Sequence, residues 1–277
     1  MYRSATVALK PENPNEAVTN LAVQLAARQH LQYTAIAVID PDLIAPAEPT
    51  PLGASAFKTH RDAARKEELQ HLAQAALDSF ARRCAESSIS CSTQLREGTL
   101  ASEITQVALS TDLLLLGHTA GTEAAAESGD RSQLNRILKH CARPCVVVPG
   151  TGGDPTKIAV AYDESIQAAR AVHDFAVGGL WKDCSIHVVS LDADSNRAAQ
   201  TAERAAAYLK LHHYQATTHP VVTRHEPAQH ILDFVHQMQA GMLVMGAFGE
   251  TNWRELVFGS VTRSILRAIT IPVFLSH

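Results

Sequence analysis

Three glycines and a serine near the end of the chain have the types and the spacing that suit anion binding. Gly246 follows an apolar run, Gly249 comes three residues later, and Gly259 is followed directly by Ser260. The apolar run predicts a buried strand, and the helical spacing of apolar residues after Ser260 predicts a helix. A glycine-bearing loop that ends at a helix N-terminus presents backbone N–H groups to an anion, and Ser260 is a favourable N-cap. Gly246 and Gly249 can adopt positive φ and can let the backbone approach a phosphate, although a tight turn alone would also explain them.

Three other positions are predicted to lie at the same sheet edge as this loop. Asp163 ends one predicted strand, Leu191 lies near the end of the next, and residues 224–227 follow a third. The carboxyl ends of parallel strands meet at one edge, and ligands of open α/β sheets bind there. A carboxylate accepts hydrogen bonds from ribose hydroxyls, open strand backbone pairs with a base, and a glycine loop binds phosphates. The arrangement therefore predicts a nucleotide site.

Catalytic groups are sparse around this loop. The chain has no G-x-x-x-x-G-K-[ST] motif, and no G-x-G-x-x-G follows a first strand. Phosphoryl transfer calls for a metal-binding carboxylate, a cation on the γ-phosphate and a group that orients water. Asp163, Arg254 and Arg263 are the candidates, so we assign no catalytic residue. A slow ATPase or phosphotransferase stays open as an alternative.

The elements that would position these residues occur twice along the chain. The first series is predicted as strands over 4–10, 33–40, 89–95, 112–117 and 145–149, with helices that include 61–85, 100–109 and 134–141. The second is predicted as strands over 157–163, 186–192, 217–223, 242–245 and 271–275, with helices over 165–177, 196–212, 227–239 and 261–269. A proline-rich segment, 41–58, is predicted as an exposed loop.

The two series are copies of one unit. Residues 135–149 align with 263–276, and the Gly/Pro-rich segment 150–157 separates the copies. We therefore expect an N-terminal domain over 1–150 and a C-terminal domain over 151–277. Strands that alternate with helices predict an α/β fold, here two tandem doubly wound, mostly parallel five-stranded sheets of the flavodoxin or Rossmann kind.

The second copy resembles the universal stress protein family, in the subgroup with the signature G-x2-G-x9-G-[ST]. Gly246-Ala-Phe-Gly249, nine residues and Gly259-Ser260 match that signature in full, and Asp163 matches the family's aspartate after the first strand. The resemblance implies an adenine nucleotide alpha hydrolase-like fold and a stress-response regulator that binds ATP, ADP or AMP, with Mg²⁺ as a candidate companion. It places the nucleotide on these residues: Asp163, Leu191 at the adenine, and Gly246, Gly249, Gly259, Ser260 and Val261 at the phosphates.

The first copy departs from this signature. Lys10 stands at the position of Asp163, and Arg131 stands at that of Gly259, whereas Ser132 matches Ser260. An arginine there would occupy space that the family leaves for phosphate. We predict a degenerate site that binds no nucleotide, with another small ligand or a role in dimerisation left open.

Composition limits the partners. The net charge of −4 favours neither nucleic acid nor an anionic membrane, and no apolar run reaches the length of a membrane span. The N-terminal residues carry no signal-peptide core, so we expect a cytoplasmic protein. The resemblance also implies that residues 145–149 and 272–276 pair across a pseudo-two-fold axis, as an internal dimer. A further homodimer, or an interaction module without nucleotide, stays open.

Cysteines and histidines raise the question of a metal site. The five cysteines are an odd number in a long chain, which argues against a disulfide framework. His140, Cys141 and Cys145 could suggest a metal site, but in the repeat the two cysteines align with Ile269 and Val273 as core positions. We therefore expect no metal there. The histidines of the second copy are predicted to be surface or capping residues, and a site assembled in three dimensions stays open.

Overall fold

The computed structural model describes residues 1–12, 16–44, 55–118, 130–150, 155–247 and 260–277. The first half consists of β1 (Ser4–Leu9), α1 (Glu16–Arg28), β2 (Gln32–Ile39), α2 (Pro41–Ile44), α3 (Ser55–Glu86), β3 (Cys91–Glu97), α4 (Leu100–Ala108), β4 (Leu113–His118), α6 (Asp130–His140) and β5 (Cys145–Pro149). The second half consists of β6 (Lys157–Ala161), α7 (Ile166–Gly178), β7 (Ser185–Asp192), α8 (Ser195–Leu211), β8 (Gln215–Val222), α9 (Pro227–Met238), β9 (Met242–Gly246), α10 (Ser260–Ala268) and β10 (Val273–Ser276). The alternation of strands and helices and the repetition of the series are confirmed.

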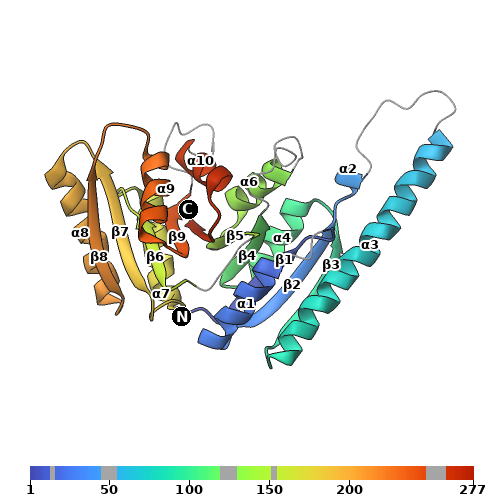
Figure 1. The fold of residues 1–277 in the computed structure, drawn as a ribbon. Helices are drawn as coiled ribbons and strands as arrows, with labels where there is room; N and C mark the ends of the chain where they lie inside the picture. Colours follow the sequence, from blue (N-terminus) through green and yellow to red (C-terminus); the bar gives the residue numbers. More distant parts are fainter. Residues whose placement is uncertain (13–15, 45–54, 119–129, 151–154, 248–259) are drawn as a thin grey trace.

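One sheet runs through the described part of the chain. Its ten strands have the order β3-β2-β1-β4-β5-β10-β9-β6-β7-β8, and every neighbouring pair except one is parallel. Within each half the strand order is 3-2-1-4-5, as in the first five strands of a Rossmann fold, and the order reverses between the first and fourth strands. Figure 1 shows the first half, in blue to green, beside the second, in yellow to red.

The exception is the pair that joins the halves. β5 and β10 are antiparallel, with Val147 opposite Val273 and Val146 opposite Phe274. The predicted pairing of the two last strands is therefore confirmed, and it merges the two expected five-stranded sheets into one.

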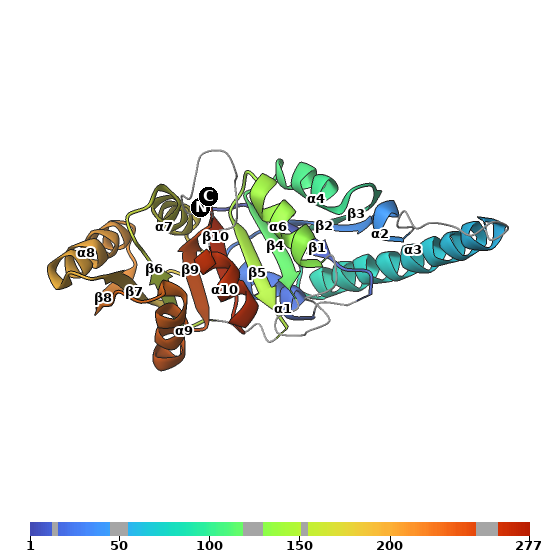
Figure 2. The same cartoon turned by 90° about the horizontal axis from the view of Figure 1, so that it is seen from above.

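Helices cover both faces of this sheet, as Figure 2 shows from above. Residues of α1, α3, α7 and α8 pack on one face, and residues of α4, α6, α9 and α10 pack on the other. Strands buried on both faces must be apolar throughout, which explains runs such as the leucines of β4. On α1 the apolar residues recur at helical spacing, so that Ala17, Leu21 and Leu25 all face the core.

Contacts beside the central strand pair also tie the halves together. The Tyr2 hydroxyl donates to the carbonyl oxygen of Asp174 at 2.7 Å, and its backbone N–H donates to that of Gly178 at 3.2 Å. Arg28 forms an ion pair with Asp183. The N-terminal segment before β1 therefore contacts α7 of the second half through Tyr2.

The predicted loop over 41–58 is wrong at both ends. Pro41 begins the short helix α2, because proline suits a first helical position and Asp40 Oδ1 accepts the N–H of Asp42 at 3.1 Å. The long helix α3 begins at Ser55 rather than at the expected residue 61, and it extends past the end of the sheet in Figure 2. Residues 45–54 lie outside the described residues, as do 151–154, so the predicted domain boundary at 150/151 stays a prediction.

Candidate functional site

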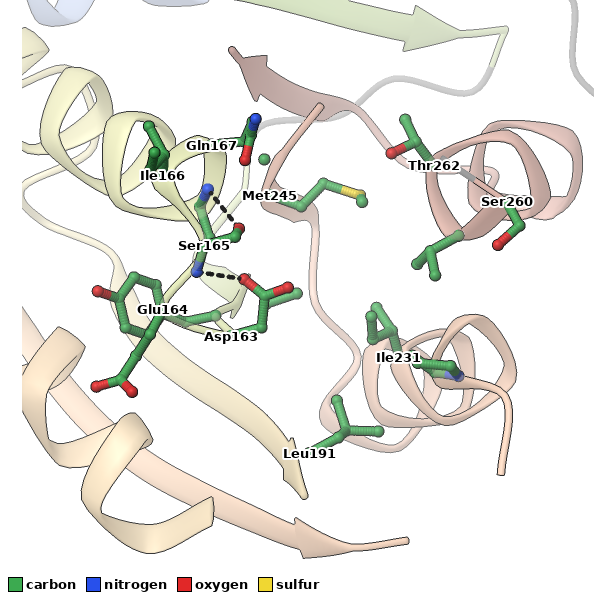
Figure 3. A pocket seen from close by; sticks show the side chains of 16 residues that line it. Asp163, Glu164, Ser165, Ile166, Gln167, Leu191, Ile231, Met245, Ser260 and Thr262 are labelled. Carbon is green, nitrogen blue, oxygen red and sulfur yellow. Dashed lines mark hydrogen bonds between the residues drawn. The ribbon is translucent and has the colours of Figure 1, made fainter. Parts of the chain in front are cut away.

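A pocket of about 620 Å³ opens at the carboxyl end of the strands of the second half. This volume lies within the range of small-molecule sites. Of the predicted site residues, Asp163, Leu191, Gly246, Ser260 and Val261 line it together, and Figure 3 shows side chains around it. Gly249 and Gly259 lie outside the described residues, as does Arg254.

Asp163 is fixed by the turn that leads from β6 into α7. Its Oδ1 accepts the backbone N–H of Ser165 at 3.0 Å, and the Ser165 hydroxyl oxygen accepts the N–H of Ala168 at 3.2 Å as the N-cap of α7. Both bonds appear as dashed lines in Figure 3. A carboxylate has two acceptor oxygens, so Oδ2 remains to accept a hydrogen bond from a ligand.

Backbone groups of Leu191 face a gap in the sheet. β6 ends at Ala161, which is paired with Val189, whereas β7 continues to Asp192 beside β8. The Val189 oxygen accepts the N–H of Tyr162 at 3.0 Å, so it points toward β6. In a parallel ladder alternate residues point to the same side, so the N–H and C=O of Leu191 point to the side that β6 has left. This is the open strand edge expected for pairing with a base.

Helix packing explains the glycine at position 246. Its φ lies outside the left-handed region, so this position does not use the freedom in φ that a glycine offers. A Cβ at this position would lie 2.5 Å from the backbone nitrogen of Ala168 and 2.6 Å from the carbonyl carbon of Gln167. The first turn of α7 packs directly on the end of β9, and only a residue without a side chain leaves room for it.

The N-terminus of α10 closes another side of the pocket. Ser260 is the first residue of this helix and is exposed, Val261 is half-buried, and Thr262 is buried. The helix begins one residue earlier than expected. Its orphan N–H groups and the positive end of its dipole lie at the pocket, which favours a negatively charged ligand group.

Apolar and polar groups occupy different parts of the lining. Leu191 of β7, Pro227 and Ile231 of α9 and Met245 of β9 provide apolar surface from three elements. Asp163, Glu164, Ser165, Gln167, Ser260 and Thr262 provide the polar groups. Such a division suits a ligand with a flat apolar part and a polar part.

Charge at the pocket is concentrated at Asp163 and Glu164. Burial raises the pKa of Tyr162, and the carboxylates of Glu164 and Asp163 raise it further, so its hydroxyl stays protonated. Glu164 adopts a left-handed φ of 62° and forms an ion pair with Arg204 of α8. This pair offsets one of the two negative charges beside the pocket.

Sequence reasoning missed several lining residues. Gln167 lines the pocket, and its Oε1 is buried without a hydrogen-bond partner among the described residues. A buried unpaired oxygen indicates a place where a ligand donor would be favourable. Thr262 and Ile231 were missed as well, because neither stands in a motif. Ile231 lies four residues after Pro227 on one helix face, which was the available signal for it, whereas Thr262 had none.

The corresponding end of the first half is held by its own polar contacts. Asp40 Oδ2 accepts the N–H of Leu100 at 2.8 Å, and Lys66 forms an ion pair with Glu97 at 2.6 Å. Lys10 follows β1 and is half-buried. The side chains of Arg131 and Ser132 lie outside the described residues, so the predicted degenerate site stays a prediction.

The cysteines are free thiols and mostly buried. Cys141 is 1% exposed and Cys145 is 2% exposed, and both belong to the core on the face of α4, α6, α9 and α10. Their interpretation as core positions is confirmed. His230 of α9 makes a local contact: its Nε2 lies 2.8 Å from the hydroxyl of Thr223, which precedes this helix.

The fold and the pocket define a doubly wound α/β protein of two similar halves with a pocket at the carboxyl edge of the second. A model of the universal stress protein family matches residues 1–149 and again residues 155–277. The chain therefore belongs to the universal stress protein family, and it is a tandem member.

Individual relatives agree with this assignment. "Universal stress protein Slr1230" of Synechocystis sp. is 27% identical over 164 residues, which cover 58% of this chain and 56% of that protein. A universal stress protein from Archaeoglobus fulgidus DSM 4304 has a similar structure, with a TM-score of 0.73, 15% identity and coverage of 98% of this chain and 97% of that chain. A functionally unknown protein from Pseudomonas aeruginosa PAO1 has a TM-score of 0.59 at 16% identity, over 99% of this chain and 92% of that chain. These structural likenesses bear on the fold alone.

Within the described residues, no helix is both long enough and apolar enough to span a membrane.

Proposed function

We propose that the C-terminal half binds ATP or a related adenine nucleotide, and that the chain acts as a stress-response regulator through this binding. The observation that carries the proposal is the pocket, since five residues named from strand ends, the glycine motif and the family resemblance line it together. These residues come from four separate places in the chain, and only the fold brings them to one sheet edge.

Each part of the pocket suits one part of such a ligand. The backbone of Leu191 faces the open edge beside β6 and would pair with the base. Asp163 Oδ2 would accept a ribose hydroxyl. The N-terminus of α10, with Gly249 and Gly259 as predicted, would hold the phosphates, and Mg²⁺ would offset their charge beside Asp163 and Glu164.

Ligand-induced stabilisation tests the proposal. A ligand that binds only the folded state at 100 times its Kd raises stability by about 2.7 kcal/mol, which is about 5–11 °C in melting temperature for a chain of this size. We expect ATP to produce such a rise in the purified chain. Asp163→Ala should weaken binding about tenfold, because it removes a charge-assisted hydrogen bond. Asp233→Ala on the exposed face of α9 is the control and should leave the affinity unchanged.

A second variant probes the phosphate end. Gly259→Arg copies the residue of the first half and should abolish the ATP-dependent rise. If ATP, ADP and AMP all leave the melting temperature of the parent protein unchanged, and mass spectrometry finds no adenine nucleotide in the purified sample, the proposal is wrong. The chain would then be an interaction module that binds no nucleotide. Turnover of ATP with Mg²⁺ that disappears in Asp163→Ala would instead assign a slow ATPase or phosphotransferase.

A further inference from the structure

Three polar side chains meet on two neighbouring strands of the second half, away from the pocket. His187 on β7 is the direct partner of Thr217 on β8, and His219 lies two residues further along β8 on the same face. His187 Nδ1 lies 3.1 Å from His219 Nε2, and the Thr217 hydroxyl oxygen lies 3.0 Å and 3.3 Å from these two nitrogens. The three atoms therefore form a nearly equilateral triangle.

Hydrogen-bond accounting shows that few protons are available inside this triangle. The Ser185 hydroxyl donates to the carbonyl oxygen of Thr156 at 3.4 Å, so its oxygen is left to accept from His187 Nε2 at 3.3 Å. That bond places the proton of the neutral ring on Nε2 and leaves a lone pair on Nδ1. The Thr217 hydroxyl donates to the carbonyl oxygen of Ile186 at 3.3 Å, so its lone pairs also face the triangle. With these bonds made, His219 Nε2 supplies the one proton inside the triangle.

Three electron-rich atoms that converge with at most one proton are better suited to a cation than to one another. We propose that His187 Nδ1, His219 Nε2 and the Thr217 hydroxyl oxygen bind a divalent transition-metal ion of the zinc type, with water completing the coordination. Two ligand atoms about 2.0–2.1 Å from a tetrahedral ion lie about 3.3 Å apart, close to the sides of the triangle. An ion about 2.1 Å from all three atoms would lie about 1 Å out of their plane.

The surroundings support this arrangement. A metal-bound imidazole usually donates its other N–H to a fixed acceptor, and Ser185 fills that role for His187. The ring of Phe234 on α9 lies 5.1 Å from the ring of His219 and limits its rotation. Thr217 is exposed, so water can reach the open coordination positions. Lys157 lies on the adjacent strand β6, and its ammonium donates to the carbonyl oxygen of Met238 at 3.3 Å. Burial, then His219, then the charge of this ammonium lower the pKa of His187, which favours the neutral imidazole that a metal needs.

The ligand types predict the choice of metal. Imidazole nitrogen favours Zn²⁺, Cu²⁺ and Ni²⁺, whereas Mg²⁺ and Ca²⁺ prefer carboxylate and carbonyl oxygens. Among the described residues no group of three histidine, cysteine or acidic side chains could hold a metal, so this site relies on two imidazoles, a hydroxyl and water. His187 precedes Leu191 by four residues, about 13 Å along β7, which separates the metal from the nucleotide pocket.

Zinc titration of the full chain, stripped of metal with a chelator, tests the proposal. In competition with a chromogenic zinc indicator we expect one Zn²⁺ per chain and no competition by excess Mg²⁺. His187→Gln and His219→Gln should each lower the affinity at least tenfold. His236→Gln, on the exposed face of α9, is the matched control and should leave it unchanged. Binding that survives both variants, or Kd values above about 1 mM in the parent, would overturn the proposal.

Milder variants guard against loss of the fold. Thr217→Val preserves the β-branched shape and removes the third ligand, and Ser185→Ala removes the partner of His187 Nε2. We expect each to weaken Zn²⁺ binding, Ser185→Ala by about tenfold. The visible spectrum of the Co²⁺-substituted chain should show the intense bands of a four-coordinate ion and lose them in Thr217→Val. A spectrum and an affinity that neither variant changes would contradict the assignment.

Discussion

Replacement of Gly246 by alanine tests whether α7 packs on β9 as closely as the structure indicates. The added Cβ would lie 2.5 Å from Ala168 N and 2.6 Å from the carbonyl carbon of Gln167, whereas favourable contacts between carbon atoms lie at about 3.5–4.0 Å. Both obstacles are backbone atoms, so no rotamer change relieves the clash and α7 must shift relative to the sheet. Overpacking of this kind costs about 1–3 kcal/mol.

Urea-induced unfolding gives the free energy of unfolding of the variant and the parent. We expect Gly246→Ala to lower it by that amount, and the melting temperature to fall by about 2–4 °C per kcal/mol. Gly150→Ala is the matched control, because a Cβ there meets nothing within 4 Å. It should be neutral or stabilising by up to about 1 kcal/mol through the unfolded state. If Gly246→Ala proved as stable as Gly150→Ala, the explanation of this glycine by helix packing would be wrong.

Three further changes have outcomes that follow from single contacts. Ser165→Ala removes the N-cap bond to Ala168 and should cost about 1 kcal/mol in urea unfolding. Tyr2→Phe removes the 2.7 Å bond to the carbonyl oxygen of Asp174 between the halves and should also cost about 1 kcal/mol, measured in the same way. Burial works to raise the pKa of Asp112, but hydrogen bonds from the backbone of β1 outweigh it and hold this pKa below its usual value. The carboxylate therefore stabilises the fold above about pH 4 and loses this effect as the pH falls through the depressed pKa, so unfolding of Asp112→Asn should depend less on pH in that range.

Much of the fold could be predicted because the sequence contains two copies of one unit. The strands of β4 and β9 are continuous apolar runs, and each is followed by a helix and a short apolar strand that aligns with its counterpart. The helix α2 could not be predicted from proline content, since proline is unfavourable inside a helix but suits its first position. Whether Pro41 ends or begins an element depends on the capping contact of Asp40, which is a tertiary detail.

The candidate site shows where motif reasoning is incomplete. Asp163 follows a predicted strand and Ser260 ends the glycine signature, and the fold brings both to one pocket. The packing of α7 on Gly246 could not be predicted, because the sequence does not distinguish a glycine that serves a turn, a ligand or a neighbouring helix. His187 was overlooked because its contact with His219 depends on the register of two strands about thirty residues apart, and no local pattern encodes that register.

The antiparallel junction of β5 and β10 has a consequence for how the two halves could diverge. In a dimer of identical chains each substitution appears twice, so a residue that meets its own copy must suit itself. Here the facing residues differ, with Val146 opposite Phe274 and Cys145 opposite Leu275. One polypeptide carries both sides, so each side can change alone while the junction stays complementary. Because the two halves need not share one sequence, the first half could lose the glycine signature and still pair permanently with the second.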